Sequence, residues 1–401
     1  MAKILFITTR LPYPANEGHQ IRTYNLLKRI CPSHEVHYLS LQRKDDDPAA
    51  VAHLETMCRS VQVFPIPNDH SKVRFAKDLL LGFFTATPFV VRKYFSRDLA
   101  RAIEEKLAAE QFDLVHFDML PLAQYASNIG KVPYVLNNHN VESLLLKRRA
   151  ENAGSLPEKI FFANQGKSLH QFEAGVCAQA RETFVCSQID ADILKSLSPA
   201  ANISVVENGV DTGFFSPGKE EMQDNSLVFV GGMGWFPNKD GMIFFMEEVM
   251  PKILAQIPDA KLTLVGKSNG VQIPETVKDS IDVTGFVDDF RPIVAAAAVY
   301  ILPIRVGSGT RLKLLEAMAM GKAIVSTSVG AEGINLSADE NIIYADDADA
   351  FARGIITLLK DKEKTLGFGH SARDVATGKY DWDIIANKLL TSYNTIITTN
   401  T

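Results

Sequence analysis

The stretch Arg305-Val-Gly-Ser-Gly-Thr-Arg-Leu-Lys-Leu-Leu-Glu316-Ala-Met-Ala-Met-Gly321 is a glycine-rich loop that leads into a helical pattern. The apolar run Val299–Pro303 precedes it and the apolar run Ala323–Ser326 follows it, and each predicts a buried parallel strand. The loop is therefore expected at the carboxyl end of a strand, where open α/β sheets bind their ligands. The stretch predicts a doubly wound sheet and a ligand site at its edge.

Basic and hydroxyl residues in this stretch favour an anionic ligand such as a diphosphate. We expect the first turn of the helix to carry Thr310, Arg311 and Lys313, beside free N–H groups and the positive end of the helix dipole. Glu316 lies deeper in the helix, and an ionised carboxylate only accepts hydrogen bonds. A carboxylate beside a phosphate site is typical of a group that binds ribose hydroxyls.

Length and composition restrict the class of protein. The chain has 401 residues, which predicts two domains, and its 46% hydrophobic and 22% charged residues are ordinary for a globular protein. A net charge of −5 argues against nucleic acid as a partner. The four cysteines lack the short paired spacing of zinc or redox sites, so we expect reduced thiols and a cytoplasmic protein. No cleavable signal is visible at the start, and the longest apolar run, Ile293–Ile304, is too short to span a membrane.

Short apolar runs alternate with helical patterns along the whole chain, which predicts an α/β fold with parallel sheets. A polar stretch, Ser216–Ser226, interrupts the rhythm and suggests two Rossmann-like domains facing each other across a cleft. We place the first domain at 1–212, joined by a C-terminal helix at 381–401, and the second at 213–380. The expected strands are Lys3–Thr8, Glu35–Leu41, Val61–Pro65, Leu114–Phe117, Val132–Asn137, Glu182–Val185, Ile203–Val206, Leu227–Val230, Lys261–Val265, Ile281–Thr284, Val299–Pro303, Ala323–Ser326 and Ile342–Tyr344.

Two residues of the first half follow strands where they would face this cleft. Gly18 ends the turn after the first strand, where a glycine permits close approach to a ligand or simply makes a turn. His139 follows the strand Val132–Asn137, and a neutral imidazole there would bond a substrate hydroxyl. The alternative for a histidine is a buried, satisfied side chain, which suits His116 better. No second ligand-type residue recurs at a chelating interval near His139, so no metal site is expected.

Two loops of the second half suggest nucleotide contacts. Gly231 and Gly232 follow the first strand of that half, and Lys239 stands near the start of the next helix, as in a phosphate cradle. The loop lacks the Gly-Lys-Ser/Thr ending of a P-loop, so hydrolysis of ATP or GTP is not indicated. The run Gly285-Phe286-Val287 either clasps a flat base through its backbone or is a plain turn.

These motifs, in this order, resemble the family 4 glycosyltransferases of the GT-B fold. The likeness spans nearly the whole chain and rests on Val205–Asp211, the loop with Lys239, Leu264–Gly266, Thr284–Asp288 and Gly307–Gly321. It implies transfer of a sugar from a nucleotide-diphosphate sugar to an acceptor, with retention of anomeric configuration and with neither metal nor other cofactor. It also implies that the last helix, predicted by the amphipathic run Tyr380–Tyr393, crosses back onto the first domain.

The resemblance assigns roles to individual residues. Glu316 would hold the ribose hydroxyls, His139 would touch the donor sugar, and Gly18 would approach the diphosphate from the opposite domain. Fixed positive groups there are the natural catalytic device, because cleavage of the glycosyl–phosphate bond builds negative charge on the leaving diphosphate. The residues that would neutralise that charge are Lys239, Gly307, Ser308, Gly309, Thr310, Arg311 and Lys313.

One position departs from the family pattern. Two glutamates in this motif usually have seven residues between them, and the earlier position is Ser308 here. The missing carboxylate normally helps to recognise the donor sugar, so the motif leaves the identity of that sugar less restricted than usual. It also leaves no evident carboxylate nucleophile, which favours front-face substitution over double displacement.

An apolar, aromatic segment with basic flanks, Lys72–Lys93, lies in the first half, and Lys147-Arg-Arg149 follows another leucine run. Such patterns suit a surface that rests on the anionic inner face of a membrane and admits a lipid-linked acceptor. The alternative is that the segment packs into the core of the first domain or lines the acceptor cleft.

Three functions therefore compete. The leading hypothesis is a retaining sugar transferase acting on a glycan, a lipid-linked glycan or a small molecule, of the kind found in bacterial exopolysaccharide assembly. A nucleotide-sugar epimerase or a phosphorylase of the same architecture would use similar phosphate contacts. A non-catalytic nucleotide-sugar-binding subunit is the third possibility, because Ser308 replaces a glutamate.

Overall fold

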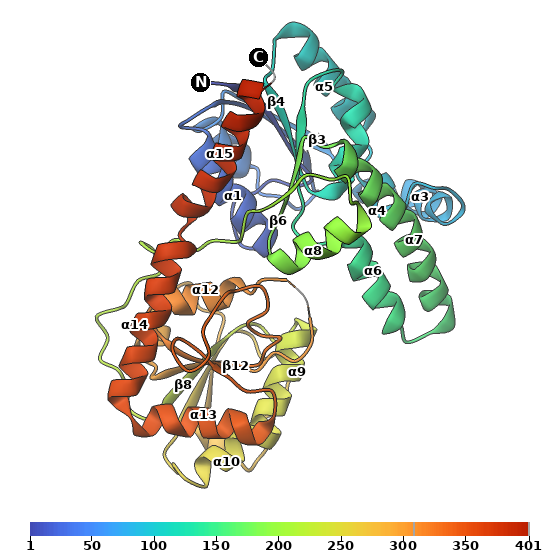
Figure 1. Ribbon diagram of the computed structural model, residues 1–401. Coiled ribbons are helices and arrows are strands. Elements are labelled where there is room, and N and C mark those ends of the chain that lie inside the picture. The colour runs from blue at the N-terminus through green and yellow to red at the C-terminus, as the bar shows by residue number, and fades with distance from the viewer. Residues whose placement is uncertain (308, 400–401) are drawn as a thin grey trace. The chain divides into compact units, whose positions relative to one another are not determined.

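Two separate parallel sheets form the protein, as the alternating pattern predicts (Figure 1). The computed structural model describes residues 1–307 and 309–399. The chain divides into one unit made of Met1–Glu207 with Ala386–Thr401, and a second made of Asn208–Ile385. The confirmed fold class is thus two Rossmann-like α/β units, with the last helix returning to the first.

The sheet of the first unit has the strand order β3-β2-β1-β4-β5-β6-β7, and all its neighbouring strands are parallel. Its central strands are buried on both faces, which explains why they are continuous apolar runs. The strands are β1 (Lys3–Thr8), β2 (Glu35–Gln42), β3 (Ser60–Pro65), β4 (Leu114–Asp118), β5 (Tyr134–Asn137), β6 (Glu182–Val185) and β7 (Ile203–Val205).

Helices connect these strands, and several begin at a side-chain cap. Ser96, Ser155 and Ser187 each accept a hydrogen bond from a backbone N–H of the first turn, which satisfies one of the free donors there. The helices are α1 (Gly18–Ile30), α2 (Ala49–Glu55), α3 (Lys72–Phe84), α4 (Phe89–Lys93), α5 (Arg97–Ala109), α6 (Glu142–Glu151), α7 (Leu156–Gln179) and α8 (Gln188–Leu197), with 3-10 segments at Pro67–Asp69 and Leu120–Asn128.

The second unit repeats the architecture with the strand order β10-β9-β8-β11-β12-β13, again parallel throughout. Its strands are β8 (Ser226–Val230), β9 (Lys261–Val265), β10 (Ile281–Gly285), β11 (Val299–Leu302), β12 (Ala323–Ser326) and β13 (Ile343–Tyr344). Its helices are α9 (Phe236–Phe244), α10 (Met250–Leu254), α11 (Arg291–Ala296), α12 (Leu312–Ala319), α13 (Ala348–Lys360) and α14 (Lys362–Lys379), with a π-helical segment at Phe245–Val249 and a 3-10 segment at Lys278–Ser280.

The last helix, α15 (Trp382–Thr399), belongs to the first unit from Ala386 onward. Its Tyr393 is fully buried, and the tyrosine hydroxyl forms a hydrogen bond with Nδ1 of His116 on β4. His116 also stacks on Phe6 of β1, with ring centroids 4.1 Å apart. His116 is therefore buried, as the sequence predicts, and it anchors the C-terminal helix through Nδ1, while its Nε2 atom has no hydrogen-bond partner among the described residues.

The segment Lys72–Lys93 forms α3 and α4. It does not pack wholly into the core of the first unit, since α3 keeps large apolar side chains in solvent. Val73 is 81% exposed, Leu80 61% and Phe84 74%. The helical period that places Asp78 and Gly82 on the buried face leaves these apolar residues on the outer one.

Candidate functional site

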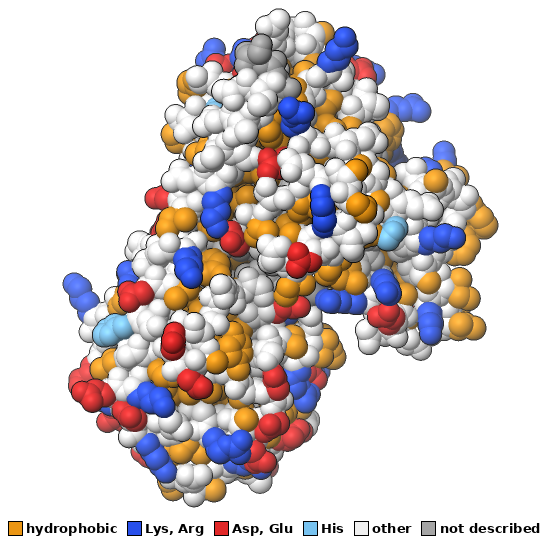
Figure 2. All heavy atoms as spheres, in the orientation of Figure 1, with side chains coloured by type: hydrophobic (Ala, Val, Ile, Leu, Met, Phe, Trp, Pro, Cys, Tyr) orange, Lys and Arg blue, Asp and Glu red, His pale blue; other side chains and the backbone are white. Residues whose placement is uncertain are grey.

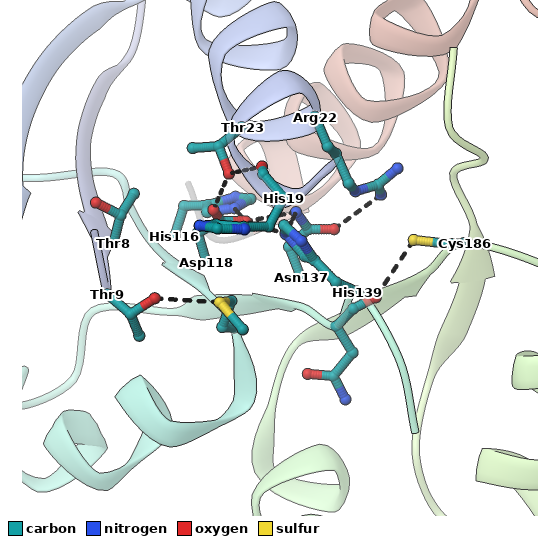
Figure 3. A network of polar contacts seen from close by, with 12 residues as sticks. Thr8, Thr9, His19, Arg22, Thr23, His116, Asp118, Asn137, His139 and Cys186 are labelled. Carbon is teal, nitrogen blue, oxygen red and sulfur yellow. Dashed lines mark hydrogen bonds and ion pairs between the residues drawn. The ribbon is translucent and has the colours of Figure 1, made fainter. Parts of the chain in front are cut away.

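Three polar residues end neighbouring strands of the first sheet at the same level. Thr8 of β1 is paired with Asp118 of β4, and Asp118 is paired with Asn137 of β5. Because the strands are parallel, these last paired positions meet at the carboxyl edge. Figure 3 shows Asp118 and Asn137 beside His139, which follows β5, and beneath side chains from α1.

The carboxylate of Asp118 is the centre of this cluster. Its Oδ1 atom accepts from Nδ2 of Asn137 at 2.6 Å and lies 3.0 Å from Nε2 of His139. Its Oδ2 atom accepts from the hydroxyl of Thr23 on α1 at 2.5 Å. A carboxylate that receives this many hydrogen bonds is fixed in position and in turn fixes the ring of His139.

The charges in the cluster follow from burial and pairing. Burial acts to raise the pKa of Asp118, but attraction to His139 and His116 and the hydrogen bond from His139 outweigh it and hold that pKa well below its ordinary value. Burial lowers the pKa of His116. Burial, followed by repulsion from His139, also lowers the pKa of His19 on α1, which points into the cluster (Figure 3). The edge therefore carries one ionised carboxylate among imidazoles.

Two structural devices hold this edge in place. Met119, directly after Asp118, has φ 93°, a conformation that is costly for a residue with a side chain. Its N–H donates to the carbonyl of Asn137 at 2.9 Å, so the chain turns sharply at the end of β4. Arg22 of α1 donates to Oδ1 of Asn137 at 2.9 Å and to the carbonyl of Val206 at 2.7 Å. A strained backbone conformation and a buried arginine thus hold the strand ends in position.

Sequence reasoning found His139 but missed Asp118, Thr23 and His19. Asp118 directly follows the predicted strand Leu114–Phe117, so the same edge rule that selected His139 selects it as well. Gly18, which was selected, is exposed and begins α1 directly before His19. The structure therefore places Gly18, His139 and the missed residues in one unit and at one end of its sheet.

In the second unit, the glycine loops after β8 and β9 pack backbone against backbone. The N–H of Gly231 donates to the carbonyl of Val265 at 2.9 Å. A Cβ atom on Gly266 would lie 2.6 Å from the carbonyl oxygen of Gly231, and Gly266 has φ +139°. Gly232 has open space where a side chain would be. Glycine is required at Gly266 for the close approach, and Gly232 exposes backbone for a ligand.

The loop after β11 differs from the sequence prediction, which placed Thr310, Arg311 and Lys313 in the first turn of the helix. Thr310 and Arg311 lie before the helix and not in its first turn, because Gly307 and Gly309 have positive φ values of 137° and 82° and delay the helical conformation. Helix α12 begins at Leu312, with Arg311 as its extended N-cap residue. Ser308 lies outside the described residues. Burial lowers the pKa of Arg311, and Glu332 opposes this.

Thr310 presents a hydroxyl to this region. Its Oγ1 atom is buried and has no hydrogen-bond partner among residues 1–307 and 309–399. Buried polar atoms are nearly always paired, so an unpaired one at a strand edge indicates a ligand contact.

Glu316 lies buried in α12, with 7% of its surface exposed. Its Oε2 atom accepts from Nζ of Lys313 at 2.9 Å, and that Nζ also lies 4.3 Å from the ring centre of Phe290. Burial raises the pKa of Glu316, while the charge of Lys313 and its hydrogen bond oppose this. A carboxylate and an ammonium group are thus held side by side in α12.

The remaining predicted donor residues lie on the surface of the second unit. Lys239 is exposed on α9, and within the described part of the chain it has no ion pair. The neighbouring Asp240 accepts from Nη2 of Arg305 at 2.9 Å and from Nε at 3.1 Å, which ties α9 to the loop after β11. Gly285 ends β10 with φ +72°, Phe286 is 73% exposed, and Val287 is half-buried. The structure therefore brings all these loops to the carboxyl edge of one sheet.

Among the described residues, Glu35, His37 and Glu110 have a spacing that would hold a metal ion. Glu35 and His37 lie at the amino end of β2, away from the carboxyl edge of that sheet, and Glu110 is the C-cap residue of α5. The ammonium of Lys3 is 2.6 Å from Oε2 of Glu110 and 3.4 Å from Oε1 of Glu35, so it already supplies positive charge there. This group is a surface ion-pair network.

Helices in the described part of the chain are all too short or too polar to cross a membrane.

Comparison with known proteins finds two family profiles that match the chain, one mainly in each unit. A family profile described as Glycosyltransferase Family 4 matches residues 17–214, and one described as Glycosyl transferases group 1 matches residues 224–361.

Individual relatives are similar to this chain over most of its length. An uncharacterized 44.6 kDa protein in the cps region of Klebsiella pneumoniae is 25% identical over 90% of this chain and 92% of its own length. The phosphatidyl-myo-inositol mannosyltransferase of Mycobacterium tuberculosis is 24% identical over 77% of this chain and 80% of its own. The fold matches that of Anabaena HepE, solved in complex with UDP, with a TM-score of 0.68, 15% identity, and coverage of 98% of this chain and 100% of that one.

Proposed function

The chain belongs to the family 4 glycosyltransferases, and we propose that it transfers a sugar with retention of configuration, without a metal ion, from a nucleotide-diphosphate sugar to a lipid-linked glycan. The observation that carries the donor assignment is the buried Glu316 beside Lys313, directly behind the glycine loop at the end of β11. The pair offers an acceptor for ribose hydroxyls and a cation for the diphosphate within one helical turn.

The catalytic part of the proposal assigns the leaving group to the second unit. Cleavage of the glycosyl–phosphate bond places negative charge on the diphosphate, and Arg311, Lys313 and Lys239 supply positive charge at the sheet edge that would face it. The hydroxyl of Thr310 and the backbone of Gly232 add donors. With the diphosphate stabilised in this way, its own oxygen would accept the proton of the acceptor hydroxyl as the bond between the sugar and the diphosphate breaks, and this route uses no metal ion.

A donor screen tests the function directly. The full chain is incubated with UDP-, GDP- and ADP-sugars, and release of the nucleoside diphosphate is measured with and without EDTA. We expect turnover of one donor class, slow hydrolysis included, that EDTA does not abolish. Turnover that requires added Mg²⁺ or Mn²⁺ would refute metal independence. Tight binding without any turnover would favour the non-catalytic subunit, and conversion of the donor without an acceptor into another nucleotide sugar would favour an epimerase.

Retention and the ribose contact need separate measurements. The anomeric proton coupling of the product shows whether configuration is retained. Calorimetry with UDP and GDP tests Glu316→Ala, which we expect to weaken nucleotide binding about tenfold or more, since a hydrogen bond to a charged group contributes roughly 1.5–3 kcal/mol. The exposed Glu363→Ala on α14 is the control. Unchanged affinity of Glu316→Ala would refute the ribose assignment.

The exposed apolar face of α3 supports contact with an anionic membrane. Val73, Leu80 and Phe84 are in solvent, and Lys72, Arg74 and Lys77 stand on the same helix. A role in exopolysaccharide assembly at the inner face of the membrane would fit this surface and the cps-region relative. Flotation with vesicles that contain anionic lipid tests it, with Leu80→Glu/Phe84→Glu as the disrupting variant and the exposed Leu366→Glu on α14 as control. Failure of the unchanged chain to float would end this part of the proposal.

A further inference from the structure

Three helices of the first unit enclose a groove that no role described so far uses. It lies between α6, α7 and α8 and has a volume of about 590 Å³. Figure 1 shows α6 and α7 side by side as a hairpin, with α8 next to them. Leu144, Ile193 and Leu197 form its apolar floor, and Ala163 lines it from an exposed position.

The helical period explains why these residues share one groove. On α7, the lining positions Lys159, Ala163, Gly166, Lys167 and His170 recur at intervals of three or four residues, so they lie on one face. The lining positions of α6 run from Ser143 to Glu151 along one face in the same way. At about 1.5 Å per residue the groove is roughly 12 Å long on the α6 side.

Positive charge surrounds the apolar floor. Lys147, Lys159, Lys167 and His170 line the groove, and Glu151 is the single carboxylate among the lining residues. The three lysines are exposed, and none of them takes part in an ion pair within residues 1–307 and 309–399. The chain as a whole has a net charge of −5, so the lining of the groove is more basic than the protein as a whole. Figure 2 shows basic and apolar side chains together over α6 and α7.

An apolar floor with a cationic rim fits an amphiphile with an anionic head. An apolar chain would cover the leucine and isoleucine side chains, and lysine ammonium groups bind phosphate oxygens as point charges. A free sugar would leave the floor unused, and a neutral lipid would leave the lysines without partners.

The inner end of the groove lies near the polar cluster of the first sheet. Ser143 is on the first turn of α6, which begins three residues after His139. Its hydroxyl and N–H both donate to the buried carboxylate of Glu173 on α7, at 2.5 Å and 3.2 Å, so this end is fixed. A ligand in the groove would therefore extend toward the edge where His139 and Asp118 stand.

We propose that this groove binds the acceptor as a lipid phosphate, with its apolar chain on the floor and its phosphate or diphosphate on Lys147, Lys159 and Lys167. The inference rests on the proposed function, because it names the class of acceptor of that transferase. It differs from the membrane contact of α3, which needs a bilayer, whereas the groove takes one lipid molecule.

Calorimetry with the full chain and decyl phosphate below its micellar concentration tests the site without any sugar transfer. We expect one molecule bound per chain, binding of neutral decyl maltoside at least about tenfold weaker, and no detectable binding of inorganic phosphate. Ala163→Trp fills the groove from an exposed position and should abolish binding, whereas the exposed Ala178→Trp further along α7 should leave it intact.

Charge reversal provides a second, independent variant. Lys147→Glu/Lys167→Glu should weaken decyl phosphate binding at least about tenfold, while Lys131→Glu/Lys219→Glu changes the net charge equally, lies elsewhere and should have no effect. Equal binding of decyl maltoside, or unchanged binding by Ala163→Trp, would overturn the proposal. Since no donor is present, either result leaves the transferase assignment standing, and a failed donor screen leaves this binding result standing.

Discussion

The Nε2 atom of His139 lies 3.0 Å from the Oδ1 atom of Asp118, whose carboxylate is ionised and also accepts from Asn137 and Thr23. A carboxylate only accepts hydrogen bonds, so Nε2 carries a proton and a neutral ring leaves Nδ1 as an acceptor. The pair fixes both the orientation and the tautomer of the histidine that the family resemblance assigns to the donor sugar.

Asp118→Asn should therefore slow transfer about tenfold or more and leave nucleotide affinity unchanged, since the loops that we propose to bind the nucleotide belong to the second unit. His139→Ala should slow transfer by roughly a hundredfold with the same unchanged affinity. Steady-state kinetics and calorimetry with the nucleotide separate the two effects.

Thr23→Val is the matched control, because it removes a hydrogen bond to Oδ2 of Asp118 without touching His139. We expect it to retain most of the activity. Equal losses of kcat in Thr23→Val and Asp118→Asn would mean that Asp118 acts through packing and not through the histidine.

Lys239→Ala should weaken nucleotide binding and also slow transfer, because its ammonium would meet charge that grows on the diphosphate in the transition state. Lys379→Ala, an exposed lysine at the end of α14, is the control for lost charge. Calorimetry gives the first effect and single-turnover kinetics the second. A loss of binding with unchanged kcat would show that Lys239 binds donor and transition state equally.

Glu142→Gln should stabilise the protein relative to the unchanged chain, and this gain in stability should be larger at pH 8 than at pH 5. Burial, and then repulsion from Glu173, raises the pKa of Glu142 to about 7 from an ordinary 4.5. Ionising it in the folded state is therefore unfavourable, so the unchanged chain loses stability as pH rises from about 4.5 to about 7. The amide removes a penalty of about 1–3 kcal/mol that is complete above pH 7.

Denaturant unfolding at the two pH values measures this difference, and the exposed Glu151→Gln at the other end of α6 is the control. A stabilisation of Glu142→Gln that is the same at pH 5 and pH 8 would contradict the assignment to this carboxyl group.

Tyr393→Phe should destabilise the first unit by about 1–3 kcal/mol, because it leaves Nδ1 of the buried His116 without a partner. Tyr13→Phe, whose ring stacks on His53, should change the free energy of unfolding by less than about 0.5 kcal/mol. Thermal unfolding compares the two. A neutral effect of Tyr393→Phe would mean that packing alone holds α15 on the first unit.

The amino-acid sequence by itself determined the sheet architecture. Buried parallel strands must be continuous apolar runs, so Lys3–Thr8, Lys261–Val265 and Ala323–Ser326 are found at the predicted bounds. Glycines that follow such strands mark the loops at a carboxyl edge, which is why the second-unit residues could be selected. Neither the helix start at Leu312 nor the delay that Gly309 causes is visible in the helical period alone.

Only the tertiary structure decided which side chains meet and which stay in solvent. Asp118, Thr23 and His139 are separated in the chain, and the pairing of β4 with β5 together with the packing of α1 brings them within hydrogen-bond distance. The apolar residues of α3 could equally have been core by composition, because hydrophobicity does not tell whether another element covers a face. Local sequence fixes the period and the breaks of each element, whereas contacts between distant elements depend on how those elements pack.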